Sequence, residues 1–105
     1  MRVLFDECVP WPIHHAFTPH ACSSAQLRGW AGRRNGALLT SAEAEFDVFV
    51  TADQNLNYQQ NLTGRRIGVV VVSTNDLRRL RQAVAAIVLA IELVRPGEVR
   101  PVIIP

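Results

Sequence analysis

The strands of this chain are predicted by runs of consecutive apolar residues and by one segment in which apolar and polar residues loosely alternate. Apolar runs predict buried strands over residues 2–5, 47–51 and 66–72. The alternating segment 20–27 predicts a further strand. Because proline cannot donate to a strand ladder, the proline-bounded segment 99–104 predicts an edge strand.

Apolar residues also recur at helical spacing between these strands. Leu38, Leu39, Ala42 and Phe46 predict a helix from about 36 to 45, with Asn35 as its N-cap. A short helix is expected to start near Pro12 and to end by Phe17. The polar segment 54–62 predicts a loop with a helical turn.

One long helix is predicted after Asp76, its N-cap, and is expected to run without a break as far as Pro96-Gly97. Its buried face follows i+3 and i+4 spacing at Leu77, Leu80, Val84, Ile87, Val88 and Ile91. The remaining positions of 83–90 are apolar too, so this helix is expected to be central or to form an interface, either in a homodimer or with a partner protein.

Alternating strands and helices predict a single α/β domain spanning residues 1–105, with a mostly parallel sheet flanked by helices. A composition of 49% hydrophobic and 19% charged residues is typical of a folded domain. The acidic and proline-rich start is unlike a signal peptide, and the longest apolar run is far too short to span a membrane. We therefore expect a cytoplasmic protein without a membrane partner.

The charged residues exclude some kinds of site. A net charge of +2 is compatible with a nucleic-acid partner. The chain has no lysine, which excludes a Walker-type phosphate loop and argues against a phosphoryl-accepting receiver domain, since that needs a lysine near its last strand. A histidine and cysteine cluster lies early in the chain, but its spacing matches no common zinc site, so free thiols are expected. This cluster comprises Cys8, His14, His15, His20 and Cys22.

Two predicted strands run directly into carboxylates, Asp6 and Asp53. Ligands bind at the carboxyl ends of parallel strands where the strand order reverses, so the two acids converge if their strands are neighbours. Two carboxylates suit Mg²⁺, which keeps several waters and takes further oxygen ligands from phosphates. Glu7 is expected to point the other way along its strand, as a secondary candidate. The alternative is that each acid only caps a turn.

The chain resembles the short PIN-like proteins, a family related to the toxin ribonucleases of bacterial toxin–antitoxin pairs. Three blocks in order carry the resemblance over nearly the whole chain. The run 2–10, Arg-Val-Leu-Phe-Asp-Glu-Cys-Val-Pro, matches a strand that ends in Asp-Glu-Asn before a proline. Gly29-Trp-Ala-Gly32 matches a loop before a helix, and the run 48–53 matches a strand that ends in Thr-x-Asp.

The resemblance implies a PIN-like three-layer fold and a Mg²⁺ (or Mn²⁺) site held by Asp6 and Asp53, with Glu7 close by. It also implies an RNA substrate and a cognate antitoxin protein. Two positions depart from the family: Asn35 and Asn55 stand where its members commonly carry acids. An amide brings no charge and cannot act as a base, so the sequence leaves open a degenerate site that binds RNA or a partner without cleaving.

Residues near the predicted acids complete the candidate site. Arg33 and Arg34 are expected to contact RNA phosphates, and Asn35 to orient water with Glu7. Asn55 belongs to an amide-rich segment that could read single-stranded bases or could simply cross the mouth of the site. A further hypothesis is that Glu43 or Glu45 compensates for the missing acids.

Overall fold

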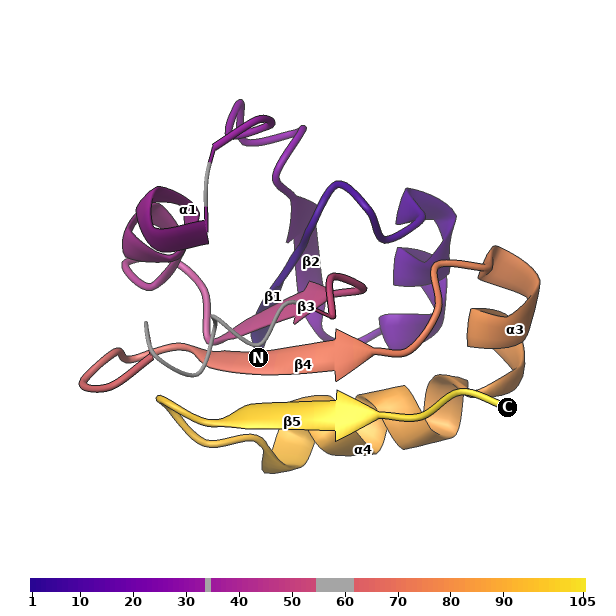
Figure 1. Ribbon diagram of the computed structural model, residues 1–105. Helices are drawn as coiled ribbons and strands as arrows, with labels where there is room; N and C mark the ends of the chain where they lie inside the picture. The colour runs from indigo at the N-terminus through magenta and orange to yellow at the C-terminus, as the bar shows by residue number, and fades with distance from the viewer. Residues whose placement is uncertain (34, 55–61) are drawn as a thin grey trace.

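A computed structural model of the protein describes residues 1–33, 35–54 and 62–105. In this part of the chain, five parallel strands form one sheet in the order β2-β1-β3-β4-β5 (Figure 1). The strands are β1 Arg2–Phe5, β2 Ala21–Ser24, β3 Val48–Thr51, β4 Gly68–Val72 and β5 Val99–Val102. The prediction of an α/β domain with a mostly parallel sheet is confirmed, and the described sheet is parallel throughout.

The strand order reverses beside β1. This strand pairs with β2 on one side and with β3 on the other, where Phe5 lies opposite Val50. The chain therefore builds the sheet in one direction from β1 to β2 and in the other from β3 to β5. Such a reversal leaves a crevice at the carboxyl ends of the two central strands.

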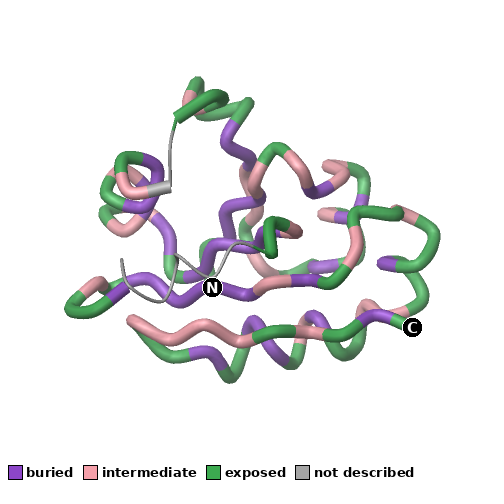
Figure 2. The backbone as a smooth tube through the Cα atoms, viewed as in Figure 1, coloured by how far each residue is buried: buried purple, intermediate pink, exposed green. Residues whose placement is uncertain are grey.

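Helices cover both faces of the sheet, which gives three layers. On one face, helix α1 (Asn35–Ala42) packs Leu38 and Leu39 against β1, β3 and β4. On the other face lie η1 (Trp11–Phe17), α3 (Leu77–Gln82) and α4 (Val84–Leu93). Successive strand residues point to opposite faces, so every side chain of the central β3 is buried (Figure 2).

The prediction of one unbroken helix after Asp76 is wrong. The helix is interrupted at Ala83, whose φ of −112° and ψ of 16° are not helical, and continues as α4. Alanine is the best helix former, so local preference does not explain the break. The two halves differ in their contacts: α3 packs against η1, whereas α4 packs against β4 and β5 as well as η1.

Other boundaries are close to the predicted ones. The strand expected over 20–27 ends at Ser24, because the chain turns there and Arg28 N–H donates to the carbonyl of Ser24 at 3.0 Å. The helix expected over 36–45 ends at Ala42, although Phe46 is buried as predicted. The helical turn expected within 54–62 falls largely outside the described residues. None of the described helices has the length and apolar character needed to cross a membrane.

Candidate functional site

Asp6 and Asp53 lie at the same edge of the sheet. Asp6 directly follows β1, and its backbone N–H still donates to the carbonyl of Val50 in β3 at 2.9 Å. Asp53 is exposed and lies two residues beyond the end of β3. Both acids line one cavity of about 560 Å³ at the carboxyl ends of the strands. The pairing of β1 with β3 is therefore what brings residues so distant in sequence to one site.

Thr51 links the two acids. It is fully buried at the end of β3, and its hydroxyl donates to Oδ2 of Asp6 at 2.7 Å. The hydroxyl oxygen of Thr51 in turn accepts a hydrogen bond from the backbone N–H of Asp53 at 3.0 Å. One hydroxyl thus orients the carboxylate of Asp6 and the chain that carries Asp53. Thr51 was not predicted to be a functional residue; its place at the last position of a buried strand was the available signal.

Cys8 also lies in this hydrogen-bond network. Its sulfur lies 3.5 Å from Oδ2 of Asp6 and 3.6 Å from the hydroxyl of Thr51, and it accepts from the N–H of Ala52 at 3.4 Å. Burial raises the pKa of the Cys8 thiol above its usual value, and the neighbouring Asp6 carboxylate raises it further. The thiol is therefore protonated at neutral pH and stabilises the charge on Asp6 as a weak donor.

Glu7 and Arg33 line the same cavity. Because β1 ends at Phe5, the strand alternation behind the expectation for the Glu7 side chain does not extend to Glu7, and the backbone N–H of Glu7 donates to Oδ1 of Asp6 at 2.8 Å. Arg33 donates to the hydroxyl of Ser41 at 2.6 Å, and its guanidinium lies 5.6 Å from the ring centroid of Trp30. A cation is thus held at a cavity that also carries carboxylates.

Three polar residues after β4 also line the cavity, and the sequence did not predict them. Ser73, Thr74 and Asn75 directly follow β4, so they reach the same edge of the sheet as the acids. The hydroxyl of Ser73 accepts from Ile104 N–H at 2.7 Å, and that of Thr74 accepts from Asp76 N–H at 3.1 Å. With a lone pair engaged in each case, both hydroxyls can present a proton to an acceptor. The signal was the position of these residues after an apolar strand.

The side chain of Gln54 links the ends of β3 and β4 by hydrogen bonds. Its side-chain amide donates to the carbonyl of Ala52 at 3.1 Å and to that of Val72 at 2.7 Å. These bonds tie the chain beyond β3 to the end of β4. The segment that carries Asp53 is thereby attached to the segment that carries the neutral polar residues of the cavity.

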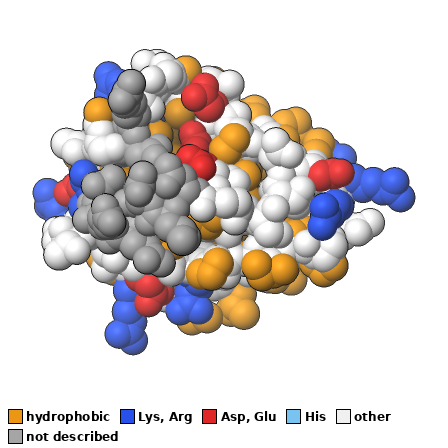
Figure 3. All heavy atoms as spheres, viewed as in Figure 1, with side chains coloured by type: hydrophobic (Ala, Val, Ile, Leu, Met, Phe, Trp, Pro, Cys, Tyr) orange, Lys and Arg blue, Asp and Glu red, His pale blue; other side chains and the backbone are white. Residues whose placement is uncertain are grey.

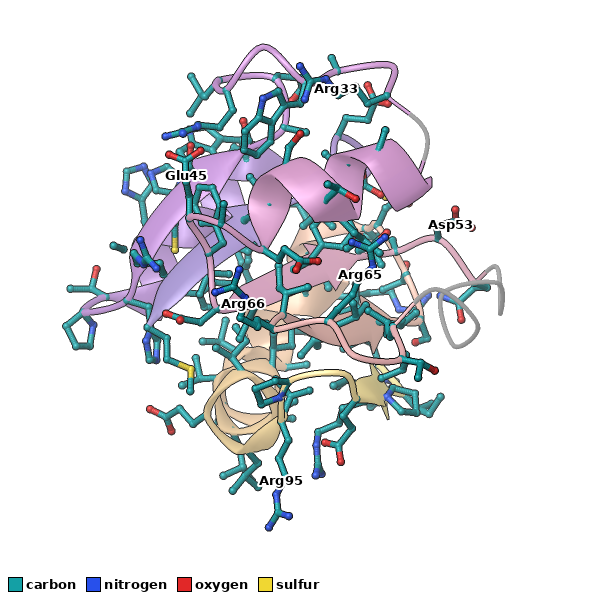
Figure 4. All side chains as sticks on the ribbon, turned by 90° about the vertical axis from the view of Figure 1, so that its left-hand side faces the viewer. Arg33, Glu45, Asp53, Arg65, Arg66 and Arg95 are labelled. Atoms are coloured by element: carbon teal, nitrogen blue, oxygen red, sulfur yellow. The ribbon has the colours of Figure 1, made fainter. Side chains whose placement is uncertain are left out.

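The acids proposed to compensate lie elsewhere. Glu43 forms an ion pair of 2.7 Å with Arg65, and Glu45 is paired with Arg28. Neither Glu43 nor Glu45 is among the described residues that line the cavity, so the hypothesis that one of them compensates for the missing acids is wrong. Figure 4 shows Arg65 beneath α1, while Arg66 lies toward the other end of the strands from Asp53.

Three further candidates, Arg34, Asn55 and the side chain of Asn35, lie outside the described part of the structure. Within that part, no three histidine, cysteine or acidic side chains are grouped closely enough to hold a metal ion. Cys8 and Cys22 are both free thiols. Cys22 lies on β2 beside His20, away from the acids.

The donors that line the cavity fit a hard cation better than a soft one. Asp6 and Asp53 supply carboxylate oxygens, and Mg²⁺ binds through one or two carboxylates with waters in the other positions. Of the described residues, Asp6 and Asp53 are therefore the candidates to hold such a cation.

The comparisons with known proteins found no matching family model, no matching curated protein and no matching solved structure.

Proposed function

We propose that this protein is a magnesium-dependent ribonuclease with a PIN-like fold, the toxin of a bacterial toxin–antitoxin pair. The observation that carries the proposal is that Asp6 and Asp53 line one cavity where the strand order reverses. An arginine and neutral hydrogen-bond donors line the same cavity, as a phosphodiester substrate requires. The RNA substrate and the antitoxin partner are inferred from the motifs that resemble the PIN-like family.

Each residue would have a separate task in the reaction. Asp6 and Asp53 would hold Mg²⁺, which when bound supplies an activated water and stabilises charge on the phosphodiester. Thr51 fixes one oxygen of the Asp6 carboxylate through its 2.7 Å hydrogen bond. Glu7 would accept a hydrogen bond from water at the cavity. Arg33 would donate to a phosphate oxygen, since its guanidinium lies at the cavity wall.

A second candidate function is RNA or partner binding without cleavage. The observation that favours it is the engagement of the Asp6 carboxylate by the protein itself. Oδ1 accepts from Glu7 N–H, and Oδ2 accepts from Thr51 and Cys8. A carboxylate has about four lone-pair positions, so these three bonds leave little of its capacity for a metal ligand. Asn35 and Asn55 would then mark a site that has lost its acids.

The test compares Mn²⁺ binding, followed by calorimetry and paramagnetic relaxation, with cleavage of a mixed single-stranded RNA. Asp53→Asn and Asp6→Asn should abolish both while leaving the circular dichroism spectrum unchanged. Glu45→Gln is the matched control, because Glu45 is a surface acid outside the cavity, and it should bind and cleave normally. Binding of RNA with neither Mn²⁺ binding nor cleavage would support the second candidate. Cleavage by Asp6→Asn would overturn the assignment of the site.

A further inference from the structure

The part of the acidic cavity that follows β4 carries no charge. Ser73, Thr74 and Asn75 form this neutral wall, beside the end of β3 that leads to Asp53. Neighbouring strands lie about 4.8 Å apart, so the neutral wall is two strands, or about 10 Å, from the end of β1. That distance is similar to the span of one nucleotide. A nucleotide held at the acids by its phosphate can therefore reach the neutral wall with its base.

The charges around the cavity favour the same orientation of a nucleotide. Among the described residues that line the cavity, Arg33 alone is a cation. On the face that Figure 3 shows, acidic side chains lie near the centre and arginine side chains toward the edges. A neutral wall cannot offset the charge of a phosphate, whereas its hydrogen-bond donors and acceptors suit an uncharged base. The phosphate is thus expected on the side of Arg33 and the base on the side of the neutral wall.

Asn75 is the residue of the neutral wall whose side chain is free to bind. The hydroxyl of Ser73 already accepts from Ile104 N–H, and that of Thr74 accepts from Asp76 N–H. Asn75 is exposed, and its amide makes no hydrogen bond to any residue that the structure describes. This planar amide presents a donor and an acceptor side by side, the combination that pairs with the edge of a base.

The backbone around Asn75 is fixed on both sides. Before it, Ser73 N–H donates to the carbonyl of Val102 at 3.1 Å, which joins the neutral wall to β5. After it, Asp76 caps α3 by accepting from Arg78 N–H at 2.9 Å. A residue held in this way loses little backbone freedom when it binds a ligand, so its hydrogen bonds contribute more of their energy to affinity.

We propose that Asn75 binds an unpaired base of the RNA, next to the phosphate that Arg33 would hold. Its amide oxygen would accept from an amino group of the base, and its amide nitrogen would donate to a ring nitrogen, as adenine offers at N6 and N7. In duplex RNA the base edges are paired or lie in a deep groove, so the substrate would be single-stranded. This inference rests on the proposed function, whether the site cleaves RNA or only binds it.

The test is a fluorescence anisotropy titration with two labelled probes of about 12 nucleotides, within the usual length of a single-strand site. One probe is oligoadenylate, and the other is a sugar–phosphate chain of the same length without bases. Ca²⁺ replaces Mg²⁺, because it also takes oxygen ligands and offsets the repulsion between acids and phosphates. Asn75→Ala should weaken binding of oligoadenylate by about fivefold or more, and binding of the baseless probe by less than about twofold.

Two control variants separate a base contact from other effects. Arg33→Gln should weaken binding of both probes by similar factors and reduce the salt dependence, because it removes a phosphate contact. Gln82 of α3 is also an exposed amide residue but is not among the described residues that line the cavity. Gln82→Ala should therefore bind both probes like the unaltered protein. Thermal melts should show that all three variants are folded.

Three results would overturn the inference alone. The first is that Asn75→Ala weakens binding of both probes equally, since Asn75 would then contact the sugar–phosphate chain. The second is that it leaves binding of oligoadenylate unchanged. The third is that the unaltered protein binds the baseless probe as tightly as oligoadenylate. An unaltered protein that binds neither probe would overturn the proposed function and this inference together.

Discussion

The hydroxyl of Thr51 donates a 2.7 Å hydrogen bond to the carboxylate of Asp6 across the pairing of β3 with β1. Its oxygen also accepts from the N–H of Asp53, so a single buried atom contacts both halves of the acidic site. A carboxylate beside other acids is most useful when its orientation is fixed before a cation arrives. Thr51 is thus a positioning residue, and it gives the first prediction.

Thr51→Val keeps the shape of the side chain but removes the hydroxyl. The protein should lose about 2 kcal/mol of unfolding free energy, because two partly buried groups lose their partner. If the proposed site binds Mn²⁺, its affinity should fall by about tenfold, the effect typical of residues that orient a ligand. Urea denaturation and a Mn²⁺ titration measure these effects. Thr51→Ser retains the hydroxyl and should retain most of the stability and of the Mn²⁺ affinity. Equal stability and equal affinity in the valine and serine variants would show that the hydroxyl does not matter.

Gly68→Ala should destabilise the fold. An added Cβ at this first residue of β4 would lie 2.9 Å from the carbonyl oxygen of Arg95 and 2.9 Å from a methyl of Val94. Since a backbone atom cannot move aside as a side chain can, we expect a loss of about 2 kcal/mol in thermal or urea unfolding.

Gly36→Ala is the matched control for that substitution. Gly36 lies in α1, and an added Cβ would meet no atom within 4 Å. Alanine is favoured over glycine in helices by about 0.5–1 kcal/mol, so this variant should be at least as stable as the unaltered protein. A Gly68→Ala protein as stable as Gly36→Ala would contradict the close packing of β4 against the end of α4.

Asp76→Ala removes the N-cap of α3. The carboxylate accepts from Arg78 N–H at 2.9 Å and from Arg79 N–H at 3.3 Å. We expect a loss of about 1 kcal/mol in unfolding free energy, the usual effect of removing a cap. Asp76→Ser should restore most of it. If serine were no better than alanine, the hydrogen bonds to the helix start would not be the source of the stability.

The Cys22 thiol should ionise at a higher pH in the folded chain than in the unfolded chain. Burial raises the pKa of Cys22 above its usual range, while the nearby N-terminal amine lowers it by less. In a Cys8→Ala background, alkylation by iodoacetamide at pH 8 should be slower in the folded than in the unfolded chain. Because the unfolded thiol loses its proton first, near pH 8.5, this residue should make stability decrease as pH rises above that value. Equal alkylation rates in both states would contradict the prediction.

Much of the fold could be predicted because apolar runs directly identify strands buried on both faces. The runs that contain Phe5, Phe49 and Val70 are strands, and each of these side chains is fully buried. The edge position of β5 followed from its prolines. The break at Ala83 could not be predicted, since alanine favours a helix and the packing of α4 on β4 and β5 is not indicated by the local sequence.

Part of the candidate site could also be predicted from the buried strands. Asp6 and Asp53 stand out because each follows a buried strand, yet their shared cavity depends on the pairing of β1 with β3, which no local pattern indicates. Thr51 and Ser73 were overlooked because hydroxyl residues at strand ends are common. Their role depends on partners far away in the chain, Asp6 in one case and Ile104 in the other.

The separation of Asp6 from Asp53 along the chain has a consequence during synthesis. Neither acid meets the other until β3 has left the ribosome and paired with β1, so a nascent chain carries no assembled site. The same holds for any fragment that a protease cuts between these strands. If the cavity cleaves RNA as proposed, the cell is exposed to that activity only after the centre of the sheet has formed.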